Sequence, residues 1–165
     1  MSAQCYLDSP VGRLLLSADG SSLTGVHFPS SRESLAADVV VDHADSPLHL
    51  ACEQLLEYFA GRRQTFQLPL AAHGSNFQQR VWAELSRIPF GETISYGELA
   101  LRLGDKGASR AVGLANNRNP IPIIVPCHRV IGADGSMVGF GGGLDRKQWL
   151  LRREATLITD RFELR

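Results

Sequence analysis

The sequence has little of what marks membrane, metal-binding or disulfide-rich proteins. Only three of its 165 residues are cysteine, Cys5, Cys52 and Cys127, and none belongs to a CxxC pair. An odd number of widely spaced cysteines suggests no disulfide framework, and the histidines are too scattered to indicate a metal site. No apolar run approaches the ~20 residues that span a bilayer, and the N-terminus lacks a basic stretch followed by an apolar one. We therefore expect a soluble, cytoplasmic protein without a metal or cofactor.

Net charge is also lacking, but the charges are unevenly distributed. The formal net charge is +0 at pH 7. Residues 1–72 contain 4 Arg and 8 Asp plus Glu, a balance of −4, whereas residues 73–165 contain 13 Lys plus Arg and 9 Asp plus Glu, a balance of +4. The C-terminal part is therefore the better candidate for binding an anion such as nucleic acid, although solvated charged faces would give the same pattern.

The first half of the chain predicts a small α/β structural domain over residues 1–72. Residues 3–28 alternate short apolar runs with turn residues, which is typical of an antiparallel meander. Ser46 and Pro47 begin a predicted helix, because proline suits the first helical position, and Gly61 ends it. Cys52 lies on the apolar stripe of this helix, so we interpret it as a packing residue. One more strand is predicted over residues 65–70.

The second half, residues 73–165, predicts a mainly helical domain, so the fold class is α+β. A helical period begins at Ser75 and ends before Pro89. Two short helices, over about residues 95–103 and 108–117, are joined by a turn that contains glycine. Such a pair indicates a helix-turn-helix, although similar pairs occur in proteins that never bind DNA.

The second helix of this pair is rich in small residues. Gly113 is costly inside a helix relative to alanine, and it is flanked at two-residue spacing by Ala111 and Ala115. Tight packing against another helix would explain this composition. Insertion into a DNA groove would explain it equally, with Arg110 reaching into the duplex and Asn116 close to phosphates.

The most distinctive stretch is residues 121–131, IPIIVPCHRVI. Its β-branched residues favour extended backbone and its prolines restrict it, so we expect a buried, irregular extended segment that holds Cys127 rigidly. A buried cysteine can be inert. However, His128 and Arg129 interrupt the apolar run, where unsatisfied polar groups would be costly, and this favours a reactive thiol.

A glycine-rich stretch, residues 139–143, follows this segment. It indicates a mobile loop or a close approach of the backbone to a ligand, and it lacks the Lys-Ser/Thr of a phosphate loop. Asp145 can cap a final helix that extends to about Arg153. Residues 155–165 have no clear assignment.

These motifs together resemble one family. The segment PCHRV at Pro126–Val130, preceded by RAVG at Arg110–Gly113 and by Asn119–Pro120, and followed by the glycine-rich loop, is similar to the O6-alkylguanine-DNA alkyltransferases of bacterial type. The resemblance implies irreversible transfer of an alkyl group from O6 of guanine in double-stranded DNA to Cys127. It also implies a protein that is consumed in one turnover, acts as a monomer or clusters on DNA, and flips the damaged nucleotide out of the duplex through a minor-groove helix-turn-helix.

The resemblance implies catalytic roles for five residues. His128, Glu154 and a water would deprotonate the Cys127 thiol. Tyr96 would crowd the phosphate, help to rotate the nucleotide and donate a proton to the leaving guanine. Asn119 would hold the backbone around the cysteine.

The resemblance likewise implies binding roles. Arg110 would fill the gap that the flipped base leaves. The remaining DNA-binding residues would be Tyr96, Ala111, Gly113, Ala115 and Asn116. The substrate-binding residues would be Val130, Phe140, Gly141 and Lys147.

The sequence departs from the family at two loop positions. Phe140 stands where bacterial members commonly have tyrosine, and Gly141 lacks the side chain that some members use to bond O6. These departures predict a roomy pocket that admits groups larger than methyl. Some relatives bind zinc through N-terminal Cys and His residues, but Cys5 and His27 have no counterparts at matching positions, so no metal is expected.

Other classes remain possible. A lesion-binding protein without transfer activity is the main alternative, although such proteins replace the cysteine that is present here. A Cys–His hydrolase of the papain type would need a substrate cleft and would turn over repeatedly. A transcriptional regulator would need an activator segment that this sequence does not show.

Overall fold

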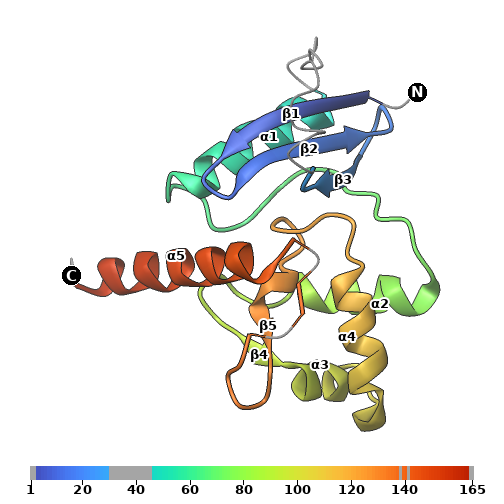
Figure 1. Cartoon of the computed structure of the whole chain (residues 1–165). Helices are drawn as coiled ribbons and strands as arrows, with labels where there is room; N and C mark the ends of the chain where they lie inside the picture. Colours follow the sequence, from blue (N-terminus) through green and yellow to red (C-terminus); the bar gives the residue numbers. More distant parts are fainter. Residues whose placement is uncertain (1–2, 30–45, 138, 141, 164–165) are drawn as a thin grey trace. The chain divides into compact units, whose positions relative to one another are not determined.

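The computed structural model describes residues 3–29, 46–137, 139–140 and 142–163, without the side chains of residues 160–163 (Figure 1). The chain forms two compact units, Met1–His73 and Gly74–Arg165. No helix in the described part of the chain is long and apolar enough to cross a membrane. The mixture of a small antiparallel sheet and helices confirms the predicted α+β class.

The first unit contains the predicted meander and helix. Strands β1 (Ala3–Ser9), β2 (Gly12–Ala18) and β3 (Leu23–His27) form an antiparallel sheet in the order β1-β2-β3. Helix α1 (Pro47–Phe59) packs against it, and its N-cap, Ser46, accepts a hydrogen bond from a backbone N–H of the first turn. The core of the unit is built from side chains that alternate along β2 and recur along α1: Leu14, Leu16, Leu48, Ala51 and Leu55.

The predicted strand over residues 65–70 is wrong. Both backbone polar groups of Gln67 are instead hydrogen-bonded to the Gln54 side chain. Gln54 Nε2 donates to the Gln67 carbonyl at 2.8 Å, and Gln54 Oε1 accepts from the Gln67 N–H at 2.8 Å. Pro69 also lacks an N–H for a strand ladder. Only Leu70 forms a bridge, a parallel one with Leu23.

The second unit begins with α2 (Asn76–Leu85), which starts where it was predicted to start. Ser75 and Gln78 form a reciprocal capping box at its N-terminus. The helix ends earlier than Pro89, and Ile88 is buried in the turn that follows it.

The predicted helix-turn-helix consists of α3 (Tyr96–Arg102) and α4 (Ser109–Asn117), separated by the short 3-10 helix η2 (Lys106–Ala108). Ser95 caps α3 by accepting a hydrogen bond from the Glu98 N–H at 3.0 Å. Helix α4 packs against both α2 and α3. Helices α3 and α4 therefore contact each other directly, and α2 supports α4.

The final helix, α5, is longer than predicted. It spans Leu144–Glu163, whereas the sequence predicts an end near Arg153, and Asp145, the predicted N-cap, lies within its first turn. The extension follows from composition, because residues 152–159 contain no glycine or proline. Ile158 packs on Gly91, whose φ is +83°, and a Cβ at Gly91 would lie 2.5 Å from Ile158 Cγ1.

Residues 121–130 are buried throughout, as predicted, but the backbone is not extended at the cysteine. Cys127–Arg129 forms a 3-10 turn, η3, in which the Arg129 N–H donates to the Pro126 carbonyl at 3.1 Å. Only β5 (Val130–Ile131) is extended, and it pairs in parallel with β4 (Ile94–Ser95). Within the described residues, Ile123 is the one non-glycine residue with positive φ, at 73°.

Candidate active site

Two asparagines connect the end of α4 to the backbone around Cys127. Asn119 Nδ2 donates to the Val125 carbonyl at 2.7 Å, and its Oδ1 accepts from the Ile121 N–H at 3.0 Å. Asn116 Nδ2 donates to the Cys127 carbonyl at 3.3 Å. The segment forms some backbone hydrogen bonds of its own, such as Val125 N–H to the Ile121 carbonyl, and the two asparagines add bonds to the Ile121 N–H and to the carbonyls of Val125 and Cys127, which helps to set its conformation.

The thiol of Cys127 is almost enclosed, with a relative exposure of 4%. Burial raises its pKa to about 11, against the opposing effects of a hydrogen bond from Asn119, the charge of Lys147 and a backbone hydrogen bond. The resting group is therefore a neutral thiol at physiological pH. Nucleophilic use of this sulfur requires a base, and Asn119 and Lys147 are the groups that stabilise the thiolate once it forms.

A fully buried ionic network lies beside the cysteine. His128 Nε2 is 2.7 Å from Glu154 Oε2. Arg129 forms a bidentate pair with the same carboxylate, Nε to Oε1 at 2.9 Å and Nη2 to Oε2 at 3.1 Å, while its Nη1 donates to the Ile88 carbonyl at 2.7 Å. His128 and Glu154 have 0% exposure and Arg129 has 5%. The carboxylate is thus satisfied on both oxygens, which is what a buried charge requires.

The network defines the protonation of the histidine. Burial alone would raise the Glu154 pKa, but hydrogen bonds and charge from His128 and Arg129 outweigh it and lower the pKa to about 2. Burial lowers the His128 pKa, and Glu154 offsets this only in part, so the imidazole is neutral at pH 7. Because a carboxylate can only accept, Nε2 carries the ring proton. Nδ1 therefore offers a lone pair, and it has no hydrogen-bond partner among the described residues.

Lys147 is a buried cation on the same face of α5 as Leu150 and Glu154. Its Nζ donates to the Val130 carbonyl at 2.6 Å and to the Gly139 carbonyl at 3.1 Å. Burial lowers its pKa to about 8, and the thiolate form of Cys127 acts in the opposite direction. Helix α5 thus supplies both the carboxylate that orients His128 and the cation that ties the glycine-rich loop to β5.

Tyr96 lies at the first position of α3 and faces the same region. Its hydroxyl donates to the Gly139 carbonyl at 3.4 Å, and Lys147 Nζ is 5.8 Å from its ring centroid. Burial and the nearby charge of Cys127 raise the Tyr96 pKa, so the hydroxyl keeps its proton. A Cβ at Gly113 would lie 3.6 Å from the Tyr96 ring, an ordinary contact, so this packing neither requires nor forbids glycine at position 113.

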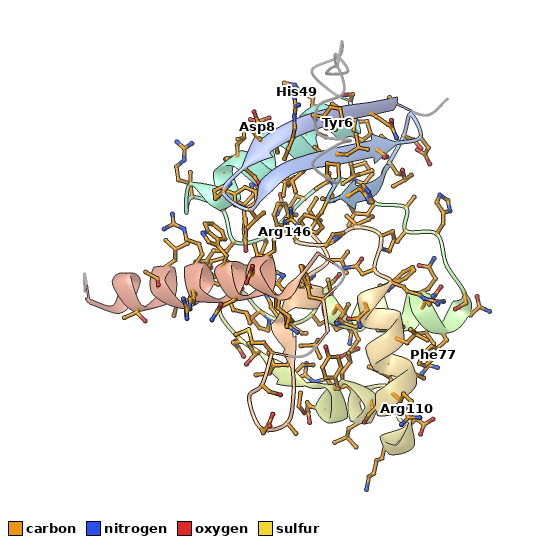
Figure 2. The ribbon with its side chains drawn as sticks, in the orientation of Figure 1. Tyr6, Asp8, His49, Phe77, Arg110 and Arg146 are labelled. Atoms are coloured by element: carbon orange, nitrogen blue, oxygen red, sulfur yellow. The ribbon has the colours of Figure 1, made fainter. Side chains whose placement is uncertain are left out.

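The predicted DNA-binding residues of α4 do not share one face. Arg110 and Ala111 are exposed at the N-terminal end of the helix, where Figure 2 shows Arg110, and Gly113 is partly exposed. The structure differs from the prediction at Ala115 and Asn116, which are buried with exposures of 3% and 0%. They lie three and four residues after buried Val112 and so face the protein interior. The Ala115 carbonyl, moreover, accepts from Trp82 Nε1 at 2.9 Å.

The structure brings Cys127, His128, Glu154, Asn119, Tyr96, Val130 and Lys147 into one cluster. Phe140 is partly buried, and its carbonyl accepts from the Gly143 N–H at 3.0 Å. Gly141 lies outside the described residues. Sequence reasoning missed the structural roles of Arg129 and Asn116. A cation inside an apolar run was the available signal for Arg129, whereas nothing local indicated that Asn116 faces inward.

Comparison with known proteins agrees with this geometry. The family model for the ribonuclease-like domain of 6-O-methylguanine DNA methyltransferase matches residues 4–72, and the model for its DNA binding domain matches residues 76–156. The chain belongs to the 6-O-methylguanine DNA methyltransferase family. Family membership covers both units, so the N-terminal unit is a regular part of the methyltransferase architecture.

Relatives of known name are similar along nearly the whole chain. A methylated-DNA–protein-cysteine methyltransferase from Methanosarcina acetivorans is 46% identical over 149 residues, which cover 90% of this chain and 96% of the relative. The crystal structure of the O6-methylguanine methyltransferase of Mycobacterium tuberculosis has 46% identity and a TM-score of 0.81, with 94% of each chain covered. A structure of the Mycobacterium tuberculosis protein in complex with DNA has 48% identity and a TM-score of 0.80, with 92% of each chain covered.

Proposed function

We propose that this protein removes an alkyl group, such as methyl, from O6 of guanine in double-stranded DNA and transfers it irreversibly to Sγ of Cys127. The observation that carries the proposal is the buried Cys127 thiol, next in the chain to a buried His128 whose Nε2 lies 2.7 Å from the Glu154 carboxylate. Membership in the methyltransferase family and the DNA complex of the mycobacterial relative support the substrate. One molecule of protein repairs one lesion, because none of the described groups around Cys127 can remove the alkyl group from the resulting thioether.

The proton of the thiol leaves through His128. In our proposal a water molecule takes the proton from Sγ and passes one to His128 Nδ1, the ring nitrogen with a free lone pair. Glu154 stabilises the imidazolium, and Arg129 keeps the carboxylate ionised. The thiolate then attacks the alkyl carbon, a carbon–sulfur bond forms and the carbon–O6 bond breaks.

The leaving guanine takes the electrons of the broken bond and needs a proton. Tyr96 is the proposed donor, because its raised pKa keeps the hydroxyl protonated beside Cys127. Lys147 stabilises the negative charge that appears first on sulfur and then on the base, and its lowered pKa of about 8 allows it to replenish the proton.

Guanine would be recognised by backbone carbonyls. The Val130 carbonyl accepts a hydrogen bond from Lys147, whereas the Cys127 carbonyl accepts two, from the Asn116 side chain and the Val130 N–H. A carbonyl has two lone pairs, so the Val130 carbonyl can accept a second bond from the exocyclic amino group of guanine, while the Cys127 carbonyl would have to share one of its lone pairs. In this proposal Phe140 and Gly141 form the wall of the base pocket.

The reaction requires the nucleotide to leave the duplex, because a buried sulfur cannot reach a stacked base. We assign the opening of the duplex to the helix-turn-helix in the minor groove. Arg110 is exposed at the start of α4 and would occupy the space left by the base, while Ala111 and Gly113 allow close approach of the backbone. The buried residues Ala115 and Asn116 take no direct part in this surface. Residues 1–72 would act as a structural domain and residues 73–165 as the domain that binds DNA and accepts the alkyl group.

Intact mass spectrometry tests this function directly. The protein is incubated with a duplex that carries one O6-methylguanine, beside a Cys127→Ser control and an undamaged duplex. We expect a gain of about 14 Da on the wild type alone, with at most one group per molecule. An unmodified protein that still binds the lesion duplex would instead indicate a damage-binding protein without transfer activity, and repeated turnover would indicate a hydrolase.

A further inference from the structure

Two cysteines that are far apart in sequence meet in the N-terminal unit. Cys5 lies on β1 and Cys52 on α1, 47 positions later, and their sulfur atoms are 3.5 Å apart. Both are reduced. No local sequence pattern pairs them, and the sequence alone indicates only a packing role for Cys52. The helix and strand that carry them are in direct contact.

The two thiols differ in access and in acidity. Cys5 is enclosed, with an exposure of 3%, whereas Cys52 is only partly buried. The hydrogen bond from Cys5 lowers the pKa of Cys52, against the effect of burial. The same hydrogen bond, together with burial, raises the pKa of Cys5. Cys52 is thus the more accessible and more acidic thiol, and Cys5 is placed behind it.

We propose that Cys5 and Cys52 form a peroxide-sensitive dithiol that closes to a disulfide between β1 and α1. The Cys52 thiolate attacks one oxygen of hydrogen peroxide and becomes a sulfenic acid, and hydroxide leaves with the electrons of the O–O bond. The Cys5 sulfur then attacks the Cys52 sulfur, and the hydroxyl group leaves as water. The overall change is two thiols plus one hydrogen peroxide giving one disulfide and two waters.

The surroundings favour a disulfide over a metal site. In the described part of the chain, no three His, Cys, Asp or Glu side chains are grouped closely enough to hold a metal ion. To form a disulfide, the sulfurs need to approach from 3.5 Å to the ~2 Å of an S–S bond. Once formed, the bond restricts the unfolded chain between β1 and α1 and so stabilises the N-terminal unit.

The alkyl-acceptor cysteine is protected from the same oxidant. Cys127 is nearly enclosed, and burial raises its pKa to about 11, so almost none of it is thiolate at neutral pH. Peroxide reacts with thiolates and not with thiols. The proposal therefore includes an order of reaction: the Cys5–Cys52 pair oxidises while Cys127 stays reduced.

The test treats the full-length protein with a small excess of hydrogen peroxide at pH 7. Remaining thiols are then blocked with iodoacetamide under denaturing conditions, and the protein is digested with trypsin without reductant. Trypsin separates the three cysteines by cutting at Arg13, Arg32, Arg62, Arg118 and Arg129. We expect the intact mass to fall by about 2 Da, a linked Cys5–Cys52 peptide pair, and a Cys127 peptide that carries only the blocking group.

Variants make the order of events visible. In Cys5→Ser the sulfenic acid on Cys52 has no partner and is trapped by dimedone, whereas Cys52→Ser should give neither a linked peptide nor a dimedone adduct. Cys127→Ser should form the disulfide as the wild type does. Oxidised wild type should melt about 10 °C higher in the transition of the N-terminal unit, and dithiothreitol should reverse the shift. The proposal fails if no linked peptide forms, if the link joins two molecules, or if Cys127 is oxidised as fast as Cys52.

Discussion

Replacing Glu154 by glutamine tests the buried network quantitatively. The change keeps the size of the side chain and removes its charge, which leaves the Arg129 guanidinium buried without a counter-ion. The folded protein lowers the Glu154 pKa from its ordinary value of 4.5 to about 2, and this difference corresponds to about 3 kcal/mol in favour of the folded state. We therefore expect Glu154→Gln to lower the free energy of unfolding at pH 7 by about 3 kcal/mol, within the range for breaking a buried ion pair.

The difference in stability between the wild type and Glu154→Gln should depend on pH. A carboxyl group whose pKa is lowered by folding stabilises the protein above its unfolded pKa, and this contribution is lost as the pH falls. The wild type should therefore lose the stabilisation from the Glu154 carboxylate between about pH 4.5 and pH 2, whereas Glu154→Gln lacks this contribution at every pH. The difference between the two proteins should shrink steadily over that range.

Urea denaturation followed by tryptophan fluorescence is the suitable assay. Both tryptophans, Trp82 and Trp149, lie in the second unit, so the signal reports the unfolding of the part that contains Glu154. Glu92→Gln is the matched control, because this glutamate is exposed in the same unit and should change stability by less than about 0.5 kcal/mol. A Glu154→Gln protein as stable as the control at pH 7, or a difference that does not shrink with acid, would refute the reasoning.

Three further predictions concern the Cys127 thiol, Asn119 and the DNA surface. The reaction of Cys127 with iodoacetamide should accelerate about tenfold per pH unit from pH 7 to 9, since the thiol pKa is about 11. A rate that levels off below pH 8 would contradict this pKa. Because folding raises the pKa, Cys127 should also lower the stability of the protein as the pH rises above 9. Asn119→Ala should lower the free energy of unfolding by about 1–3 kcal/mol, as urea titration would show, because it leaves the Ile121 N–H unsatisfied and removes one of the two hydrogen bonds that the Val125 carbonyl accepts. Arg110→Ala should slow alkyl transfer from duplex DNA about tenfold or more without changing the Tm or the reaction with a free O6-alkylguanine base; equal losses with both substrates would show that Arg110 acts on the chemistry and not on the duplex.

Local sequence determined much of the fold. The alternation of apolar and turn residues was sufficient for the meander of β1 to β3. The starts of the helices at Ser46, Ser75 and about Ser95 were also predictable, because the residues that begin a helix act within one helical turn. The PCHRV segment likewise indicated Cys127 as a candidate reactive thiol, since polar residues within an apolar run are costly unless they have partners.

Only the tertiary structure decided which partners those were. Arg129 and Glu154 are 25 residues apart, and Cys5 and Cys52 are 47 apart, so no local pattern could pair them. The inward face of Asn116 depends on how α4 packs against α2, and the 3-10 turn at Cys127 depends on hydrogen bonds to the surrounding segment. Sequence alone was sufficient for most of the helices and strands and for a candidate reactive thiol, because both follow from short-range preferences. Packing determined the pKa values and the pairings, because burial and long-range contacts exist only in the folded chain.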